Sequence, residues 1–319
     1  MQSATGSSTK AMVVAIVQKG RLVFSKGYGD TGAGAPTMNT VFYIGSLSKA
    51  VTGFGLMKLV DQGKVSLQKE VGTYVPGLPA AWSKIPLLNY TTHTSGIPGI
   101  PAKADSFQDA VNRAAEKPAF FEAGADQKYN NFNFAITGQV IEHVSGKSYL
   151  DYMKENVFDP VGMSSTGVGI TKQLVSVPNY PDVAAYGTPS GGLESSAADL
   201  VRWFQYIYNQ EGMSPHSYRL MYTPLVPTHP SGRDAWHFTP GWQARFVDGD
   251  EIVAKDGGVV GFFSMMQMVP VKGVAVIILE AHAGPGKTGT HLWPLAANIL
   301  KDIYGYTKPA AGAEVETGE

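Results

Sequence analysis

Ser46 and Lys49 are the two residues of this chain whose types and spacing most directly suggest chemistry. They stand three apart at the start of a segment, 46–62, that is predicted to be a helix ending at Gly63, so their side chains share one face. A serine hydroxyl is a weak nucleophile until a neighbouring base takes its proton. The helix N-terminus and the apolar residues around Lys49 favour a neutral amine that can serve as this base. The alternative interpretation is a chance S-x-x-K match on an ordinary helix.

A second group of reactive side chains is Tyr129-Asn130-Asn131, which precedes an amphipathic helix predicted over 132–145. A tyrosine has a reference pKa near 10, and it becomes a usable base only where nearby cations stabilise the phenolate. Asn131 has an amide that can donate to a substrate carbonyl or hold a lysine in place. The alternative is a tyrosine packed on a loop and an asparagine that caps the helix.

The third group is Lys255-Asp256-Gly257-Gly258, at the end of a strand predicted over 251–255. Glycines at that place let a substrate lie against the strand edge and leave backbone N–H groups free. Two such N–H groups form an oxyanion hole, which contributes strongly to acyl transfer. The alternative is an edge-strand lysine followed by a glycine turn.

The elements that must position these groups lie in a distinctive order. Two short β-rich runs near the N-terminus are joined by a Lys19-Gly20 hairpin, and the middle of the chain reads as helices and long loops, one helix beginning at Ser196. Near the C-terminus four β-rich runs precede a last helix over 289–304: 242–247, 251–255, 262–269 and 274–279.

Strands at both ends of the chain with helices between them predict an α+β fold, an α/β sandwich plus an all-α region. The N- and C-terminal segments form one antiparallel sheet flanked by helices, and the helical region is an insertion. We therefore expect a sheet domain made of 1–62 and 225–319 and a mainly helical domain over 63–224. The active site is expected between the two.

The composition narrows the classes of protein to consider. The chain has 319 residues, 44% of them hydrophobic, and a formal net charge of −1 with dispersed lysine and arginine. These values are typical of a globular protein and argue against a nucleic-acid partner. The absence of cysteine excludes disulfides and thiolate chemistry, and no apolar run is long enough for an integral membrane segment. A periplasmic or secreted location is slightly favoured if a signal peptide has been removed, a cytoplasmic one otherwise, and the oligomeric state stays open.

Taken in order, the three groups resemble the motifs of the serine β-lactamase and penicillin-binding-protein superfamily, and within it those of class C β-lactamases and the related esterases and D-aminopeptidases. Residues 42–49 resemble the nucleophile segment with its strand, Tyr129-Asn130-Asn131 matches Y-x-N, and Lys255-x-Gly257 stands where the family has K-T-G. Two further blocks match as well, 93–98 to H-T-S-G-L-P and 191–200 to G-G-L-x-S-x-x-D-L. The resemblance runs from about residue 12 to 280 and implies a β-lactamase/transpeptidase-like fold.

The resemblance also implies roles for individual residues. Ser46 is the acylating nucleophile, and Lys49 and Tyr129 share proton transfer, with Tyr129 the preferred direct base. Asn131 orients the substrate, and Lys255 tunes the electrostatics or binds a substrate carboxylate. The oxyanion hole consists of the N–H groups of Ser46 and Gly258. His93 is expected to be structural, and neither a cofactor nor a metal is implied.

Two departures from the family pattern shape the expected substrate. Asp256 replaces a threonine that helps to grip a substrate carboxylate, and its charge repels an anionic substrate unless strand alternation turns it away. The chain is also short for a class C enzyme. Both favour an esterase, amidase or D-amino-acid peptidase that acts through an acyl-enzyme on a small ester, amide or D-peptide. A true class C β-lactamase or D,D-carboxypeptidase is the alternative.

Other readings of the sequence compete with this one. The stretch 281–288 fits a relaxed phosphate-loop pattern after a strand, so a nucleotide-binding protein is a remote alternative. The same stretch begins a literal Lys287-Thr288-Gly289, which lies after the last strand and is rejected as the third motif. No serine has the G-x-S-x-G context of an α/β-hydrolase, and the seven histidines have no H-E-x-x-H spacing. A non-enzymatic binding or sensory module with intact reactive residues is the remaining alternative.

Overall fold

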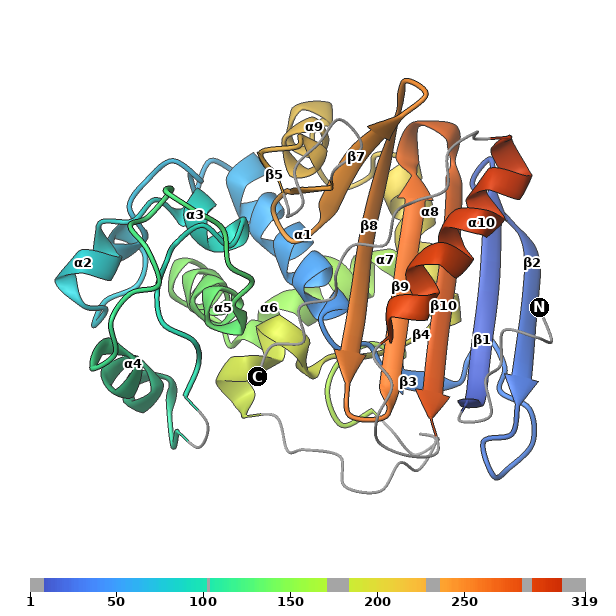
Figure 1. Cartoon of the computed structure of the whole chain (residues 1–319), viewed down its shortest axis with the longest axis horizontal. Coiled ribbons are helices and arrows are strands. Elements are labelled where there is room, and N and C mark those ends of the chain that lie inside the picture. Colours follow the sequence, from blue (N-terminus) through green and yellow to red (C-terminus); the bar gives the residue numbers. More distant parts are fainter. Residues whose placement is uncertain (1–8, 102–103, 171–183, 228–235, 283–288, 306–319) are drawn as a thin grey trace.

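An eight-stranded sheet forms the centre of the computed structural model, which describes residues 9–101, 104–170, 184–227, 236–282 and 289–305 (Figure 1). The strands lie in the order β2-β1-β10-β9-β8-β7-β6-β5, and each neighbouring pair is antiparallel. Their bounds are β1 Thr9–Gln18, β2 Arg21–Gly29, β5 Val226–Pro227, β6 His237–Phe238, β7 Gln243–Val247, β8 Asp250–Val259, β9 Phe262–Val269 and β10 Val274–His282. The pairing of β1 with β10 joins the two ends of the chain, so the predicted antiparallel sheet is confirmed.

The turns that connect these strands follow from local sequence. Lys19 and Gly20 both have positive φ, 48° and 71°, as the predicted two-residue hairpin between β1 and β2 requires. Asp248 and Gly249 adopt the same left-handed conformation between β7 and β8. Such turns match the twist of the strands that they join, so the register of both hairpins is set locally.

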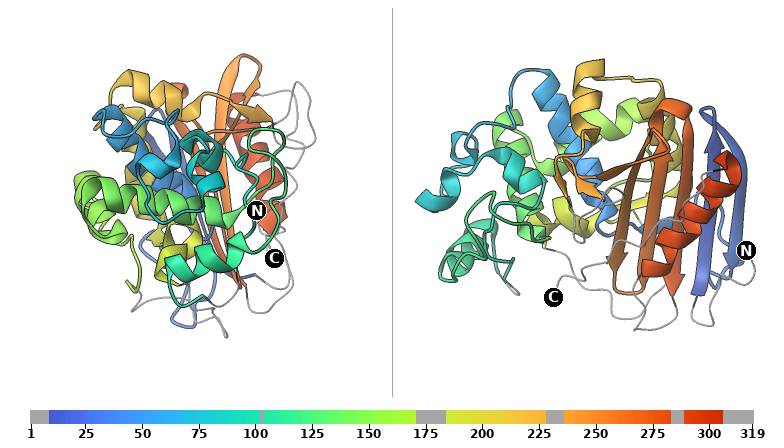
Figure 2. Two further views of the ribbon diagram at one scale, coloured as in Figure 1. Left: turned by 90° about the vertical axis from the view of Figure 1, so that its left-hand side faces the viewer. Right: turned by 45° about the horizontal axis from the view of Figure 1, so that its top comes forward.

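Helices cover the sheet on both faces, as Figure 1 and Figure 2 show for α10 on one of them. Side chains of β10 alternate between the two resulting cores. Ile277 and Leu279 pack on the side of α1 (Leu47–Asp61) and α8 (Ala197–Tyr208), whereas Val276 and Ile278 pack under α10 (Leu292–Tyr304). This strand is buried on both faces, which explains its continuous apolar run.

In the described part of residues 63–224, one long helix and the 12-residue α8 are accompanied by shorter helices. The long helix, α5, runs from Asn131 to Ser145 and ends at Gly146 in the left-handed conformation, as the sequence predicts. The small sheet β3–β4 (Val41–Tyr43 and Glu194–Ser196) ties this region to the segment before α1. The remaining helices are α2 Ala80–Ser83, α3 Leu87–Thr91, α4 Phe107–Ala115, α6 Tyr149–Met153, α7 Asp159–Val161 and α9 Pro215–Tyr222. Among the described residues, no helix is both long and apolar enough to cross a membrane.

Two predicted boundaries near the C-terminus were wrong. Strand β8 continues to Val259 because Gly257 and Gly258 pair with Ser264 and Phe263 of β9, so the third motif lies inside the strand and not at its end. The last helix begins at Leu292 and not at 289, since residues Gly289–His291 form a 3₁₀ turn. Pro294 explains this start, because proline lacks an N–H and is tolerated only in the first turn of a helix.

Candidate active site

Ser46 lies at the N-terminus of α1, directly after β3 and a two-residue connection. Gly45, in that connection, has a φ of 50° and packs so tightly on β8 that an added β-carbon would lie 2.8 Å from the Gly258 nitrogen. Gly53, inside α1, comes equally close to Pro240: its added β-carbon would lie 2.4 Å from that carbonyl oxygen. Glycines before and within α1 therefore allow close packing on neighbouring backbone, and this packing fixes where Ser46 points.

Lys49 is completely buried, and its ammonium or amine group has three polar neighbours. Its Nζ lies 3.0 Å from Ser46 Oγ, 2.7 Å from Asn131 Oδ1 and 2.6 Å from the Ser190 carbonyl oxygen. Burial, reinforced by the nearby charge of Lys255, lowers the pKa of Lys49 well below its ordinary value. A neutral lysine is therefore favoured at this place.

The three contacts of Lys49 fix the direction of its lone pair when the amine is neutral. The carbonyl oxygens of Asn131 and Ser190 only accept hydrogen bonds, so the two N–H groups of the amine serve them. Ser46 is the one partner of the three that carries a proton to give. The neutral amine thus directs its lone pair at the Ser46 hydroxyl.

Tyr129 approaches Ser46 from the other side. Its hydroxyl lies 2.6 Å from Ser46 Oγ and is the donor in the described geometry. Lys49 Nζ lies 4.6 Å and Lys255 Nζ 5.3 Å from the centre of the Tyr129 ring. The predicted arrangement of two lysines beside the phenol is therefore present.

Lys255 projects from β8 toward Tyr129 and is 4% exposed. Burial alone would lower the pKa of Lys255, but the neighbouring Tyr129 and Asp256 outweigh it and raise this pKa above its ordinary value. Asp256 Oδ1 accepts a hydrogen bond from Lys255 Nζ at 3.2 Å. Strand alternation therefore does not separate this carboxylate from the lysine, and Lys255 remains protonated beside a partly neutralising acid.

The edge of β8 beside Ser46 is not covered by a neighbouring strand among the described residues. Pairing between β7 and β8 reaches only as far as Gln243 opposite Ala254, whereas residues 255–259 pair with β9 alone among the described strands. Gly257 is pressed against the nucleophile segment, because an added β-carbon would lie 1.9 Å from the Ile44 carbonyl oxygen. Gly258 follows at once, so its backbone lies next to the segment that bears Ser46.

The sequence model of the Beta-lactamase family matches residues 3–301, nearly the whole chain. The chain belongs to the β-lactamase family. The resemblance inferred from the motifs is thereby confirmed, and so is membership of a family of serine hydrolases.

Curated relatives of this β-lactamase-family protein include one named as a peptidase and one named as a penicillin-binding protein. The D-alanyl-D-alanine-carboxypeptidase/endopeptidase AmpH of Escherichia coli K12 is 26% identical over 86% of the chain and 80% of the relative. A protein of Bacillus subtilis named putative penicillin-binding protein PbpX is 29% identical over 66% of the chain and 58% of the relative.

Solved structures share the fold of this β-lactamase-family protein. The octameric penicillin-binding protein homologue from Pyrococcus abyssi matches with a TM-score of 0.82 at 23% identity, covering 93% of this chain and 74% of that one. A class C β-lactamase matches with a TM-score of 0.80 at 19% identity over 93% and 92% of the two chains. A D-amino acid amidase from Ochrobactrum anthropi SV3 matches with 0.78 at 19% identity over 95% and 96%. The predicted β-lactamase/transpeptidase-like fold is confirmed.

His93 lies against the site and not in it. Its Nδ1 accepts the Asn130 N–H at 3.1 Å, and its ring lies 4.4 Å from that of Tyr129 between ring centres. Burial, reinforced by the nearby Lys49 and Lys255, lowers the pKa of His93 well below its ordinary value. A neutral imidazole therefore supports the Tyr129 loop, which agrees with the structural role expected from the sequence.

Ser190 is a residue of the site that sequence reasoning missed. Its carbonyl holds Lys49, and the adjacent Pro189 carbonyl accepts a hydrogen bond from Thr52 of α1 at 2.8 Å. Leu193 completes the attachment: its N–H donates to Ser48 Oγ at 3.1 Å and its carbonyl accepts from Ile44. The G-G-L block was the available signal, but the block does not reveal that a backbone carbonyl just before it is the contact.

Most of the competing stretch near the C-terminus lies outside the part of the chain that the structure describes. Residues 283–288, which include Lys287 and Thr288, lie outside the described residues, and so does most of the phosphate-loop pattern. Strand β10, which precedes that pattern, is antiparallel to both neighbours. Gly289 packs on Phe263 under α10, on the opposite face of the sheet from α1. Lys255, by contrast, lies in β8 with its Nζ 5.3 Å from the centre of the Tyr129 ring.

Proposed function

We propose that this protein is a serine hydrolase that cleaves ester or amide bonds through an acyl-enzyme at Ser46. The observation that carries the proposal is the position of Ser46 Oγ, 2.6 Å from the Tyr129 hydroxyl and 3.0 Å from Lys49 Nζ. A nucleophile with two proton-transfer partners in hydrogen-bond reach is the arrangement that nucleophilic catalysis requires.

In the proposed acylation step, Ser46 Oγ attacks the substrate carbonyl carbon and its proton passes to the Lys49–Tyr129 pair. The tetrahedral intermediate then collapses, and the same proton is delivered to the leaving alcohol or amine as its bond to carbon breaks. A water molecule afterwards attacks the ester of Ser46 with the pair acting again as base. The serine is regenerated and the acid product leaves.

Tyr129 and Lys49 are both candidates for the base, each for a different reason. Tyr129 makes the shorter contact with Ser46, and the charged Lys255 beside its ring stabilises a phenolate. Lys49 is buried, favoured as the neutral amine, and directs its lone pair at Ser46. We keep Tyr129 as the preferred direct base and assign Lys49 the relay of the proton. Asn131 holds Lys49 and has an amide nitrogen for the substrate carbonyl.

We further propose that the N–H groups of Ser46 and Gly258 form the oxyanion hole. Support comes from the close packing of β8 on the nucleophile segment and from the hydrogen bond of Ser264 Oγ to the Ile44 carbonyl at 2.7 Å. Both hold the two backbone groups in fixed relation, which is the condition for preorganised stabilisation of a developing oxyanion. The substrate would lie along the unpaired edge of β8.

The proposed substrate is a neutral ester, an amide or a D-amino-acid derivative. Asp256 lies beside Lys255 and weakens the pull of that lysine on a substrate carboxylate. A D,D-carboxypeptidase must hold such a carboxylate, so this chain is less suited to that reaction than to cleavage of uncharged groups. The activities for which two similar proteins are named, D-alanyl-D-alanine carboxypeptidase and D-amino acid amidase, define the panel to test.

The proposed site also suggests how the chain is divided. A sheet domain of 1–62 and 225–319 would provide Ser46, Lys49 and Lys255, and a helical domain over 63–224 would provide Tyr129. We also propose an exported location, with which the absence of cysteine is compatible. Cell fractionation tests that location directly.

Mass spectrometry after incubation with a fluorophosphonate, a short p-nitrophenyl ester and a penicillin tests the acyl-enzyme. We expect a single adduct on Ser46, none in Ser46→Ala, and an unchanged adduct in Ser25→Ala, which removes an exposed serine on β2. Turnover of p-nitrophenyl esters, D-amino-acid amides and nitrocefin then ranks the substrates. A folded protein that forms no adduct with any of the three reagents would refute the proposal.

A further inference from the structure

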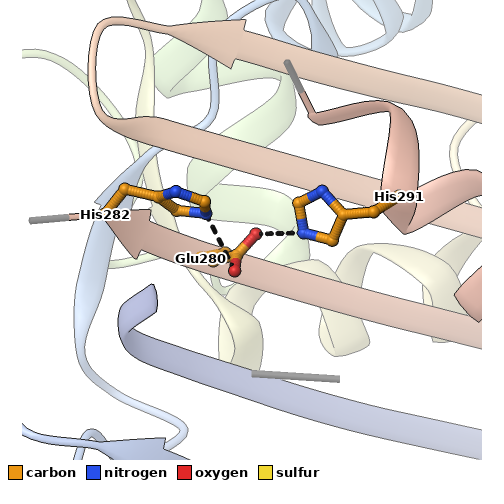
Figure 3. Close-up of side chains that lie close together, drawn as sticks. All are labelled: Glu280, His282 and His291. Atoms are coloured by element: carbon orange, nitrogen blue, oxygen red, sulfur yellow. Dashed lines mark hydrogen bonds and ion pairs between the residues drawn. The ribbon is translucent and has the colours of Figure 1, made fainter. Parts of the chain in front are cut away.

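A cluster of metal-ligand side chains lies on the face of the sheet that α10 covers, away from Ser46. Glu280 and His282 are two residues apart on β10 and therefore project to the same face. His291 comes from the 3₁₀ turn before α10 and points at the same carboxylate (Figure 3). Neither histidine belongs to the proposed acyl-transfer site.

The geometry of the cluster suits one small cation. His282 Nε2 lies 2.9 Å from Glu280 Oε1 and His291 Nε2 lies 2.7 Å from Glu280 Oε2. One ligand atom from each residue falls within 4.8 Å of the others. Zinc binds histidine nitrogen at about 2.0–2.1 Å and carboxylate oxygen at about 2.0–2.2 Å, so small side-chain rotations bring all three atoms to one ion.

The cluster is largely buried, which distinguishes it from a group of polar residues on the surface. Glu280 is 0% and His282 2% exposed, whereas the side chain of His291 is 34% exposed and opens the cluster on one side. A buried carboxylate is costly unless cations or donors compensate it. Thr9 on β1 also donates to Glu280 Oε1 at 2.6 Å, the kind of outer hydrogen bond that orients a metal-binding carboxylate.

We propose that Glu280, His282 and His291 form a binding site for a zinc-class divalent cation, with two imidazole nitrogens, one carboxylate and an open position beside His291. On binding, each imidazole gives up the Nε2 proton that it donates to Glu280, which passes to solvent or to Nδ1, so that the Nε2 lone pair faces the ion and the one remaining proton is on Nδ1. Two histidines and a glutamate are a donor set that zinc uses in proteins. The proposal does not depend on the activity of Ser46.

The position of the cluster in the sheet indicates what the ion would do. Glu280 lies opposite Phe263 of β9, and Phe263 lies opposite Gly258 of β8. The Phe263 ring also contacts His282, with ring centres 4.9 Å apart. The ion would tie β10 to the start of α10 at the far end of this row, so we expect it to stabilise the sheet behind the oxyanion strand and not to take part in hydrolysis.

Titration of the untagged full chain, first stripped with a chelator, with Co²⁺ tests the site. We expect one equivalent to bind with visible absorption bands typical of nitrogen and oxygen coordination, and Zn²⁺ to displace it. Because only the folded state has the assembled ligands, saturating Zn²⁺ should also raise the melting temperature. The proposal is overturned if the chain binds less than half an equivalent of Co²⁺ at a free concentration of about 100 µM.

His291→Ala identifies the ligands, because His291 is the least buried of the three and its removal disturbs the core least. It should weaken Co²⁺ binding at least about tenfold, since even outer-shell changes cost about 10–100-fold. His143→Ala, which removes an exposed histidine of α5, is the matched control and should bind normally. If both variants bind Co²⁺ equally well, His291 is not a ligand and the cluster is only a hydrogen-bonded triad. In that case Glu280→Gln, with its folding checked by circular dichroism, should also bind Co²⁺ normally, and the proposal is overturned.

Discussion

At the residue scale, the hydroxyl of Ser46 has two partners whose ionisation is set by their surroundings. Burial lowers the pKa of Lys49 and favours its neutral form, while Tyr129 and Asp256 raise the pKa of Lys255 and favour its charged form. The two lysines of the site thus have opposite pKa shifts, which is a common sign of a proton-transfer site. One can accept a proton, and the other provides a fixed positive charge beside the phenol.

Tyr129→Phe tests the shared base. The change removes only the hydroxyl that lies 2.6 Å from Ser46 Oγ and keeps the ring that packs on His93. We expect kcat for a p-nitrophenyl ester to fall at least about 100-fold, with an unchanged melting temperature. A loss below about tenfold would show that Lys49 acts without the phenol.

The pH dependence of acylation follows from the two lysines. Because the pKa of Lys49 is lowered, its neutral form appears as pH rises through a value well below 10.5, so kcat/KM should increase over that range. Because the pKa of Lys255 is raised, Lys255 loses its charge only above pH 10.5, so its deprotonation should not lower activity at neutral pH. The increase of kcat/KM with pH therefore reports an apparent pKa of the coupled Lys49–Tyr129 pair. Stopped-flow acylation rates measure it, and a rate that falls as pH rises from 6 to 9, over about three units, would contradict the assignment.

Asp256→Thr tests the substrate charge. Removal of a carboxylate that contacts Lys255 should improve kcat/KM for substrates with a free carboxylate about tenfold relative to neutral esters. Paired assays of an ester and its carboxylated analogue measure the ratio. If the ratio stays the same in the variant, Asp256 does not influence substrate choice.

At the scale of elements, the site depends on how closely strand β8 approaches the start of α1. Gly257→Ala should force these two elements apart, because its β-carbon would lie 1.9 Å from the Ile44 carbonyl oxygen. We expect the free energy of unfolding to fall by about 1–3 kcal/mol. We also expect kcat/KM to fall by about 100-fold, since a misplaced oxyanion strand costs that much.

Gly99→Ala is the matched control for that change. An added β-carbon at Gly99 meets nothing within 4 Å, so the substitution has no packing cost. Urea denaturation and ester turnover of the two variants should therefore differ clearly. If Gly257→Ala behaved like Gly99→Ala, the close approach of β8 would not be a requirement of the site.

At the scale of the whole molecule, the sheet and the helices are joined by an aromatic core. Trp203 of α8 is fully buried, its ring centre lies 5.3 Å from that of Trp242, and it meets Phe54 of α1 edge-on at 5.9 Å. These contacts connect α1, which carries the nucleophile, to the segment before β7. The orientation of the nucleophile helix on the sheet therefore depends on this core.

Trp203→Ala should lower the free energy of unfolding by about 3–5 kcal/mol, the usual loss for a buried tryptophan. Phe246→Ala, on β7, is the control, because Phe246 is 54% exposed. Chemical denaturation should give a change below about 0.5 kcal/mol for the control. Similar losses for both variants would mean that the core does not depend on Trp203.

The sequence by itself determined the elements whose signals are local. The hairpin at Lys19-Gly20, the end of α5 at Gly146 and the β-rich runs at both ends follow from turn residues and periodicity, and the motifs around Ser46, Tyr129 and Lys255 indicated the family. Local sequence could not place the end of β8, because the strand persists through Gly257 and Gly258 only by pairing with β9.

Only the tertiary structure decided which groups meet. Lys49 touches Asn131 and the Ser190 carbonyl across 82 and 141 residues of sequence, and a backbone carbonyl carries no signal in residue type. The Glu280, His282 and His291 cluster arises because a turn folds back over its own strand. Distances, burial and the resulting pKa shifts depend on the packing of α1, α5 and β8 against one another. The sequence therefore supplied the reactive residues, and the fold decided their protonation and their partners.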